Sequence, residues 1–172
     1  MNELQEKIFD VIMSLLSGKS FASSVRNSAI RYGFLNYVAK FSLANDYYYA
    51  SPSAFDHLYD SGFLRSERLR RSMKSKRNMF TYEHVIPVNV IGNELLKYPR
   101  DPNKVREILI FADYIVILTP PENALLAGGS LRSKMPCNFE FFTSDPFSRY
   151  IKVGLPELRN LIKVPVFGAL RR

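Results

Sequence analysis

The stretch YIVILTPPENALLAGG, residues 114–129, carries the strongest local structural signals in the chain. Residues 114–118 form a continuous apolar run of strand length. Thr119 then provides an N-cap, a proline occupies the first helical position, and Glu122 places a carboxylate three residues after the cap. A double glycine ends the pattern. The stretch therefore predicts a buried strand that leads directly into a helix, with Asn123 in the first turns of that helix.

A second informative stretch, TYEHVIPVN at residues 81–89, lies upstream. Residues 79–90 are rich in β-branched and aromatic side chains and contain Pro87, which predicts a short strand that ends in a turn. The strand would carry the adjacent pair Glu83 and His84. Adjacent strand positions point to opposite faces, so two interpretations stay open: a catalytic pair, or a surface acid beside a half-buried histidine.

The chain is basic, with 24 Lys and Arg against 16 Asp and Glu and a formal charge of +8. Such an excess favours polyanionic partners, nucleic acid above all. The positive charges are densest in a basic strip over residues 65–77, where Glu67 is the one acidic residue. The strip consists of Arg65, Arg68, Arg70, Arg71, Lys74, Lys76 and Arg77. The strip predicts contacts to phosphate, although a solvated helical face is the alternative. Arg132 and Lys134 form a smaller basic pair beyond residues 114–129, with a solvated loop as the alternative.

The remaining pattern predicts mostly helix. Apolar residues at spacings of three and four, together with Gly and Pro boundaries, place helices at about residues 3–16, 20–43, 52–59, 91–98, 103–111 and 155–162. With two short strands, this makes an α+β fold. A chain of 172 residues fits one domain, with a helical N-terminal part over residues 1–77. His57 would be a surface or hydrogen-bonded histidine rather than a catalytic one.

Composition also excludes several classes of protein. Cys137 is the single cysteine, so neither an internal disulfide framework nor a four-cysteine zinc site can form in one chain. The N-terminal residues have the pattern of neither a signal peptide nor a membrane span. We therefore expect a cytoplasmic protein without a membrane partner.

The order of strand, connection, strand and helix, together with Glu83-His84-Val85-Ile86-Pro87, resembles the HNH or ββα-metal nucleases. The pentapeptide is similar to that family's D/E-H-x-x-P signature. The resemblance covers about residues 78–128, roughly a third of the chain. It implies a small ββα-metal nuclease core within the mostly helical α+β fold.

The resemblance also implies roles for individual residues. His84 would be the general base that activates water, and Glu83 would bind a divalent cation, Mg²⁺ or Mn²⁺. Asn123 or Glu122 would be the ligand on the helix. The family's middle asparagine, which orients the histidine, has Asn89 and Asn93 as candidates.

These expectations combine into a metal-dependent, HNH-like endonuclease that hydrolyses phosphodiester bonds, with DNA preferred over RNA as its substrate. A toxin-like ribonuclease that uses the same histidine without a metal stays open. A restriction-type enzyme would be sequence-specific, and a homodimer would place two centres on two strands. The alternative is a non-catalytic nucleic-acid-binding protein that uses the basic strip, with Glu83 and His84 as scaffold. A protein-interaction module whose charge is incidental is a third interpretation.

Overall fold

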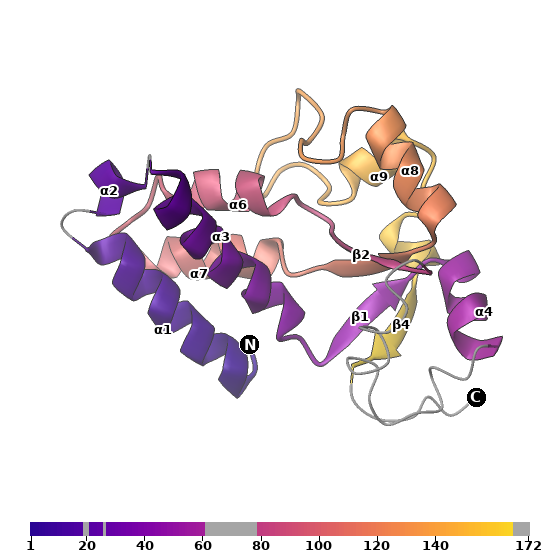
Figure 1. The fold of residues 1–172 in the computed structure, drawn as a ribbon, viewed down its shortest axis with the longest axis horizontal. Helices are drawn as coiled ribbons and strands as arrows, with labels where there is room; N and C mark the ends of the chain where they lie inside the picture. Colours follow the sequence, from indigo (N-terminus) through magenta and orange to yellow (C-terminus); the bar gives the residue numbers. More distant parts are fainter. Residues whose placement is uncertain (19–20, 26, 61–78, 167–172) are drawn as a thin grey trace.

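The computed structural model describes residues 1–18, 21–25, 27–60 and 79–166, and it shows an α+β fold with a mixed sheet (Figure 1). The strand order is β2-β3-β1-β4. β2 pairs with β3 and β4 pairs with β1 in antiparallel fashion, whereas β1 and β3 are parallel. The strands are β1 (Tyr47–Ala50), β2 (Thr81–His84), β3 (Ile115–Leu118) and β4 (Ile162–Pro165).

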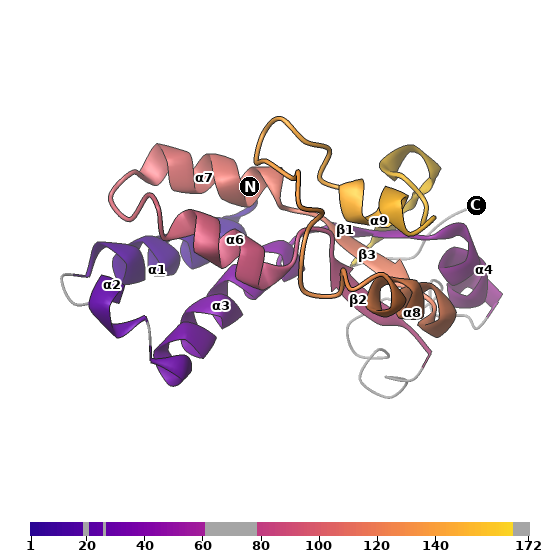
Figure 2. The same ribbon diagram turned by 90° about the horizontal axis from the view of Figure 1, so that it is seen from above.

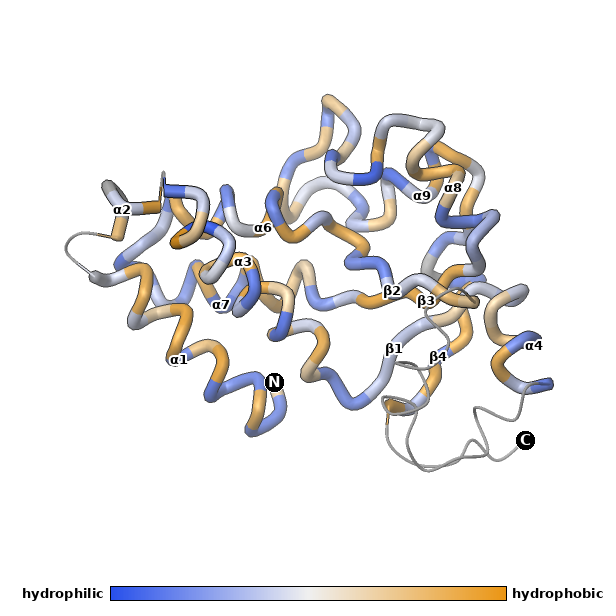
Figure 3. Tube along the Cα trace, in the orientation of Figure 1, coloured by the Kyte–Doolittle hydropathy of each residue, from blue (hydrophilic) through white to orange (hydrophobic). Residues whose placement is uncertain are grey.

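A group of helices packs beside the sheet rather than over it (Figures 1 and 2). Its core is a cluster of buried side chains that includes Ile12, Phe34, Phe41, Ile91 and Ile108. Figure 3 shows apolar and polar residues alternating along α1, as expected for a helix with one buried face. The group consists of α1 (Glu3–Ser17), α2 (Phe21–Ser24), α3 (Ser28–Leu43), α6 (Val88–Leu95) and α7 (Pro102–Phe111).

The two faces of β3 are both covered, because all four of its residues are buried. Ile115 and Ile117 belong to a cluster with the apolar face of α4 (Pro52–Asp60). Val116 and Leu118 belong to a second cluster with α8 (Pro120–Gly128) and α9 (Ser148–Lys152). A strand that is buried on both faces needs apolar side chains at consecutive positions. Residues 114–118 have this continuous apolar pattern.

The strand-to-helix prediction for residues 114–129 is confirmed by β3 and α8. The Glu122 carboxylate caps the N-terminus of α8, as predicted. Its Oε2 accepts hydrogen bonds from the Thr119 backbone N–H at 2.8 Å and from the Thr119 hydroxyl at 2.8 Å. The Ser51 hydroxyl, at the start of α4, donates to the same oxygen at 2.7 Å. This carboxylate therefore links the helix to a neighbouring element.

Predictions for the N-terminal helix, for the helices at 52–59 and 103–111, and for a surface position of His57 are also confirmed. Three other predictions were wrong in extent. The single helix over 20–43 is interrupted, because Asn27 caps a new helix by accepting a hydrogen bond from the Ala29 N–H. The strand over 79–90 stops at His84, and α6 begins directly after Pro87, which has no N–H to donate to a sheet.

The third wrong prediction is the helix over 155–162. This segment forms only a 3₁₀ turn at Leu158–Asn160, and its end is recruited into the sheet as β4, opposite β1. Neither β1 nor β4 was predicted from the sequence. Each has four residues, and tertiary pairing overrides local preference at that length.

Candidate active site

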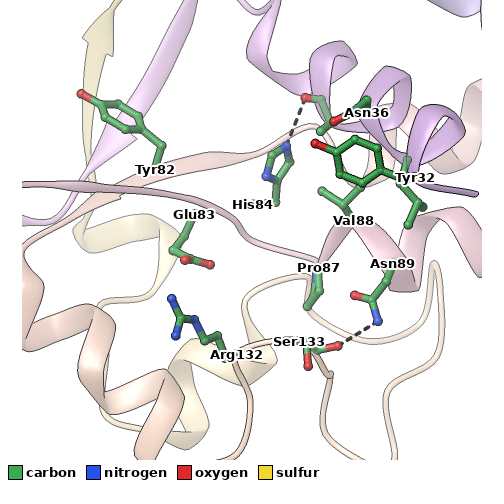
Figure 4. A pocket seen from close by; sticks show the side chains of 12 residues that line it. Tyr32, Asn36, Tyr82, Glu83, His84, Pro87, Val88, Asn89, Arg132 and Ser133 are labelled. Carbon is green, nitrogen blue, oxygen red and sulfur yellow. Dashed lines mark hydrogen bonds between the residues drawn. The ribbon is translucent and has the colours of Figure 1, made fainter. Parts of the chain in front are cut away.

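Glu83 and His84 lie side by side at the end of β2, and their side chains leave opposite faces of the strand (Figure 4). The Glu83 side chain is on the face covered by α9, where its Oε2 accepts a hydrogen bond from the Arg149 Nη2 at 3.3 Å. The Arg149 side chain has no exposed surface. Burial raises the pKa of the Glu83 carboxyl, and the positive charges of Arg149 and Arg132 oppose that shift.

Arg149 holds the local backbone as well as the carboxylate. Its Nε donates to the Val85 carbonyl at 2.7 Å, and its Nη1 donates to the Leu131 carbonyl at 2.8 Å and the Arg132 carbonyl at 3.1 Å. Its Nη2 also donates to the His84 carbonyl. One guanidinium therefore fixes the exit of β2 against the loop that follows α8. No chemistry was assigned to residues 145–150 from the sequence. The signal that could have pointed to Arg149 is a lone cation between Phe147 and Tyr150.

The His84 imidazole points towards α3, where its Nε2 lies 3.1 Å from the Ala39 carbonyl oxygen. A carbonyl oxygen can only accept, so Nε2 carries the proton and donates. Burial lowers the pKa of His84, and the charge of Arg149 lowers it further, while the hydrogen bond to Ala39 opposes the shift. The ring is therefore neutral at neutral pH, with an unprotonated Nδ1. Figure 4 shows this second ring nitrogen turned away from α3. A neutral imidazole with a free lone pair can accept a proton from water.

Both side chains line one pocket of about 510 Å³ between α3, β2, the start of α6 and the loop after α8. The Arg132 guanidinium projects towards Glu83 from that loop (Figure 4). Tyr32 and Asn36 of α3 form the opposite wall, and Val88 contributes to the apolar part of the lining. The pocket is an open depression of the surface rather than an enclosed cavity.

The two asparagine candidates for orienting His84 lie at different places. Asn89 lines the same pocket, and its Nδ2 donates to the Ser133 carbonyl at 3.1 Å. Asn93 lies one helical turn further along α6, where its Oδ1 accepts from Arg31 at 2.6 Å. The group that contacts the imidazole is instead the backbone carbonyl of Ala39. A backbone contact of this kind leaves no mark in the sequence.

The helix residues Glu122 and Asn123 are not among the residues that line the pocket. Glu122 binds the three donors described above. The Oδ1 of Asn123 is buried and has no hydrogen-bond partner. Burial raises the pKa of the Tyr150 hydroxyl, and the charges of Glu83 and Glu122 add to that shift, so the two carboxylates lie within electrostatic reach of one side chain. Asn123 is thus the helix candidate whose oxygen is not already engaged.

The donor types fit a hard divalent cation, since Mg²⁺ and Mn²⁺ prefer carboxylate and amide oxygens. The buried, unpartnered Oδ1 of Asn123 is the observation that favours such a ligand. The pairing of Glu83 with Arg149 works against it, because a guanidinium competes for the same oxygen. Among the residues that the structure describes, no three His, Cys, Asp or Glu side chains form a group that could hold a metal ion.

Of the predicted phosphate contacts, Arg132 is placed at the pocket, whereas Lys134 is exposed two residues further on. Arg65, Arg68, Arg70, Arg71, Lys74, Lys76 and Arg77 lie outside the described residues. The basic strip therefore stays a prediction from the sequence.

The protonation state of His84 can be measured directly, because the chain has only two histidines. In a His57→Gln variant, the remaining imidazole signals come from His84. We expect their pH titration to have a midpoint below 6.5, because burial penalises the imidazolium. The unfolded chain then binds this proton more tightly than the folded one, so His84 lowers the stability of the fold as pH falls below about 6.5. Nitrogen-15 shifts should place the neutral ring's proton on Nε2. A midpoint at or above 6.5, or a proton on Nδ1, would contradict the geometry.

No helix in the described part of the chain is long and apolar enough to span a membrane. Comparison of the chain with known protein families, with curated proteins and with solved structures found no match.

Proposed function

We propose that the protein is a metal-dependent endonuclease of the HNH type that hydrolyses phosphodiester bonds in DNA. The observation that carries the proposal is the position of His84: its imidazole is held through Nε2 by the Ala39 carbonyl, beside the Glu83 carboxylate at a pocket. The antiparallel pair of β2 and β3, followed directly by α8, supports it, because this is the order of elements that the resemblance implies.

In the proposed reaction, His84 accepts a proton from a water molecule at its Nδ1, while the Ala39 carbonyl keeps the ring oriented. Arg132 would hold a phosphate oxygen at the pocket, because it is the exposed cation there. Glu83 would hold a divalent cation, which supplies charge neutralisation at the phosphate and the leaving oxygen, and the resemblance would add Asn123 from α8, which does not line the pocket. Arg149 fixes the backbone on which Glu83 and His84 stand.

The test is incubation of the purified protein with plasmid DNA and, separately, with RNA. We expect supercoiled plasmid to be nicked or linearised in Mg²⁺ or Mn²⁺, to stay intact with a chelator, and to be cut again when the metal is restored. Preparations of the His84→Ala variant, purified in parallel, exclude a contaminating nuclease. The absence of cutting under all metal conditions would contradict the proposal. Cutting that a chelator leaves unchanged would show that no metal is required.

The alternative is a non-catalytic nucleic-acid-binding protein, and one observation favours it. Glu83 is hydrogen-bonded to a fully buried Arg149, which is the environment of a structural ion pair. In that case the protein would retard DNA at low salt in a gel-shift experiment without cutting it. Binding by the wild type without cleavage in Mg²⁺ or Mn²⁺ would select this alternative.

A further inference from the structure

The helix α3 forms one wall of the pocket that contains His84, and it does so with one face. The residues that line the pocket from this helix are Tyr32, Leu35, Asn36 and Ala39. Their spacing of three, four and seven residues places them in a row along the helix. Because Ala39 contacts the imidazole, the same rigid helix fixes the position of Tyr32 relative to His84. Seven residues correspond to about 10 Å along the helix axis.

Tyr32 is unusual among the large hydrophobic residues that the structure describes, because 70% of its surface is exposed. A second tyrosine on the same helix, Tyr37, is 37% exposed, and the Lys40 ammonium lies 5.5 Å from the centre of its ring. The Tyr32 ring instead lines the same pocket as His84 (Figure 4). The exposed ring of Tyr32 at the pocket offers an aromatic face on which a flat base can stack.

The lining of the pocket contains two chemically different groups of side chains. Glu83, His84 and Arg132 are polar or charged, and the exposed cation Arg132 suits a phosphate oxygen. Tyr32, Leu35 and Val88 are aromatic or apolar. A nucleotide has the same division, with a charged phosphate joined to a flat base that stacks on aromatic rings. A phosphate alone would leave the aromatic and apolar side chains without a contact.

We propose that Tyr32 is a base-stacking residue, which receives an unpaired nucleobase within about three nucleotides of the phosphodiester bond at His84, with Asn36 beside it to contact the base edge or the sugar. The distance follows from the spacing of about 10 Å along α3 and a rise of about 3.4 Å per nucleotide in a strand. The base must be unpaired because both faces of a base inside a duplex are already stacked on its neighbours. The substrate class is therefore single-stranded DNA, or DNA with a locally opened base. The inference rests on the proposed function, because it names the substrate class of the same pocket.

The chain contains no tryptophan, which makes a direct test available. In a Tyr32→Trp, His84→Ala variant, the fluorescence of tryptophan comes only from position 32 and the DNA is not cut. Titration with a short oligothymidine should quench this fluorescence, because the base stacks on the indole. An oligomer of the same length whose sugar-phosphate backbone lacks bases should not quench it. The matched control is a Tyr37→Trp, His84→Ala variant, in which quenching is not expected.

Affinity provides the second readout. We expect Tyr32→Ala to weaken binding of oligothymidine by about 5- to 150-fold, the range for loss of one base–aromatic stack, and to leave binding of the baseless oligomer unchanged. Tyr32→Phe keeps the ring and should bind like the wild type, and so should Tyr37→Ala. Circular dichroism of each variant checks the fold, and the exposed position of Tyr32 makes a folding defect unexpected.

Failure of the two proposals can be told apart. Equal quenching by the baseless oligomer, or an unchanged affinity for oligothymidine in Tyr32→Ala, would overturn the stacking role even if the wild-type protein cuts DNA. Quenching at position 32 together with a wild-type protein that never cuts would overturn the endonuclease and support the stacking role. Absence of binding to any oligonucleotide at low salt would overturn both.

Discussion

Replacement of His84 with alanine is expected to lower the rate of DNA cleavage by about 10²- to 10⁴-fold, the usual contribution of a positioned general base. The physical reason is that His84 is a neutral imidazole whose Nε2 is bound to the Ala39 carbonyl, so that only its Nδ1 can accept the proton from water. Single-turnover cleavage of a plasmid with excess enzyme measures this rate without a contribution from product release.

The matched control for this experiment is His57→Ala. His57 is the other histidine of the chain, and it lies exposed on α4, outside the residues that line the pocket. We expect its replacement to leave the cleavage rate unchanged, and we expect both variants to bind DNA within about twofold of the wild type. A His84→Ala variant that cuts within about threefold of the wild-type rate would show that another group is the base. Loss of binding together with loss of cleavage would point to a structural role for His84.

Replacement of Arg149 with leucine is expected to lower the free energy of unfolding by about 3–5 kcal/mol, the cost of removing one partner from a buried ion pair. The Glu83 carboxylate, which is 16% exposed, would lose its cation, and the carbonyls of Val85 and Leu131 would lose their donor. Lysine at the same position keeps a charge but cannot reproduce the planar fork of donors. The free energy of unfolding of Arg149→Lys should therefore lie between those of the wild type and Arg149→Leu. Urea denaturation followed by circular dichroism measures each value.

Arg159 offers a matched control for the loss of an arginine. Its side chain is 77% exposed and pairs with Glu157 at 3.0 Å, so Arg159→Leu should change the free energy of unfolding by less than about 1 kcal/mol. A Glu83→Gln change added to Arg149→Leu should recover part of the lost stability, because it removes the unpaired charge. An Arg149→Leu variant as stable as the Arg159→Leu variant would show that the buried guanidinium does not stabilise the fold.

Much of the helical fold was predictable because its signals are local. The capped start of α8 depends on Thr119 and Glu122, which are three residues apart, and the amphipathic face of α1 depends on spacings of three and four. The strands were harder. β3 could be identified because burial on both faces makes it continuously apolar. By contrast, β1 and β4 are four-residue segments that become strands only through sheet pairing, β1 with β3 and β4, and β4 with β1.

The candidate site divides in the same way. Glu83 and His84 were found because they are neighbours within one short motif, and Arg132 was found because it is a cation just beyond a predicted helix. Arg149 was missed because it lies 66 residues from Glu83 along the chain. The contact of Ala39 with His84 spans 45 residues and uses a backbone carbonyl, which no choice of side chain reveals.

By itself, the sequence determined the elements whose stabilising contacts lie within a few residues: the capped helix α8, the apolar strand before it, and the acid–histidine pair on β2. Only the tertiary structure decided which ring nitrogen of His84 is free, what holds Glu83 in place, and that Tyr32 stands opposite them at one pocket. The reason is physical. Local patterns fix backbone conformation through nearby hydrogen bonds and burial, whereas the protonation and orientation of a side chain depend on whichever distant groups the fold brings against it.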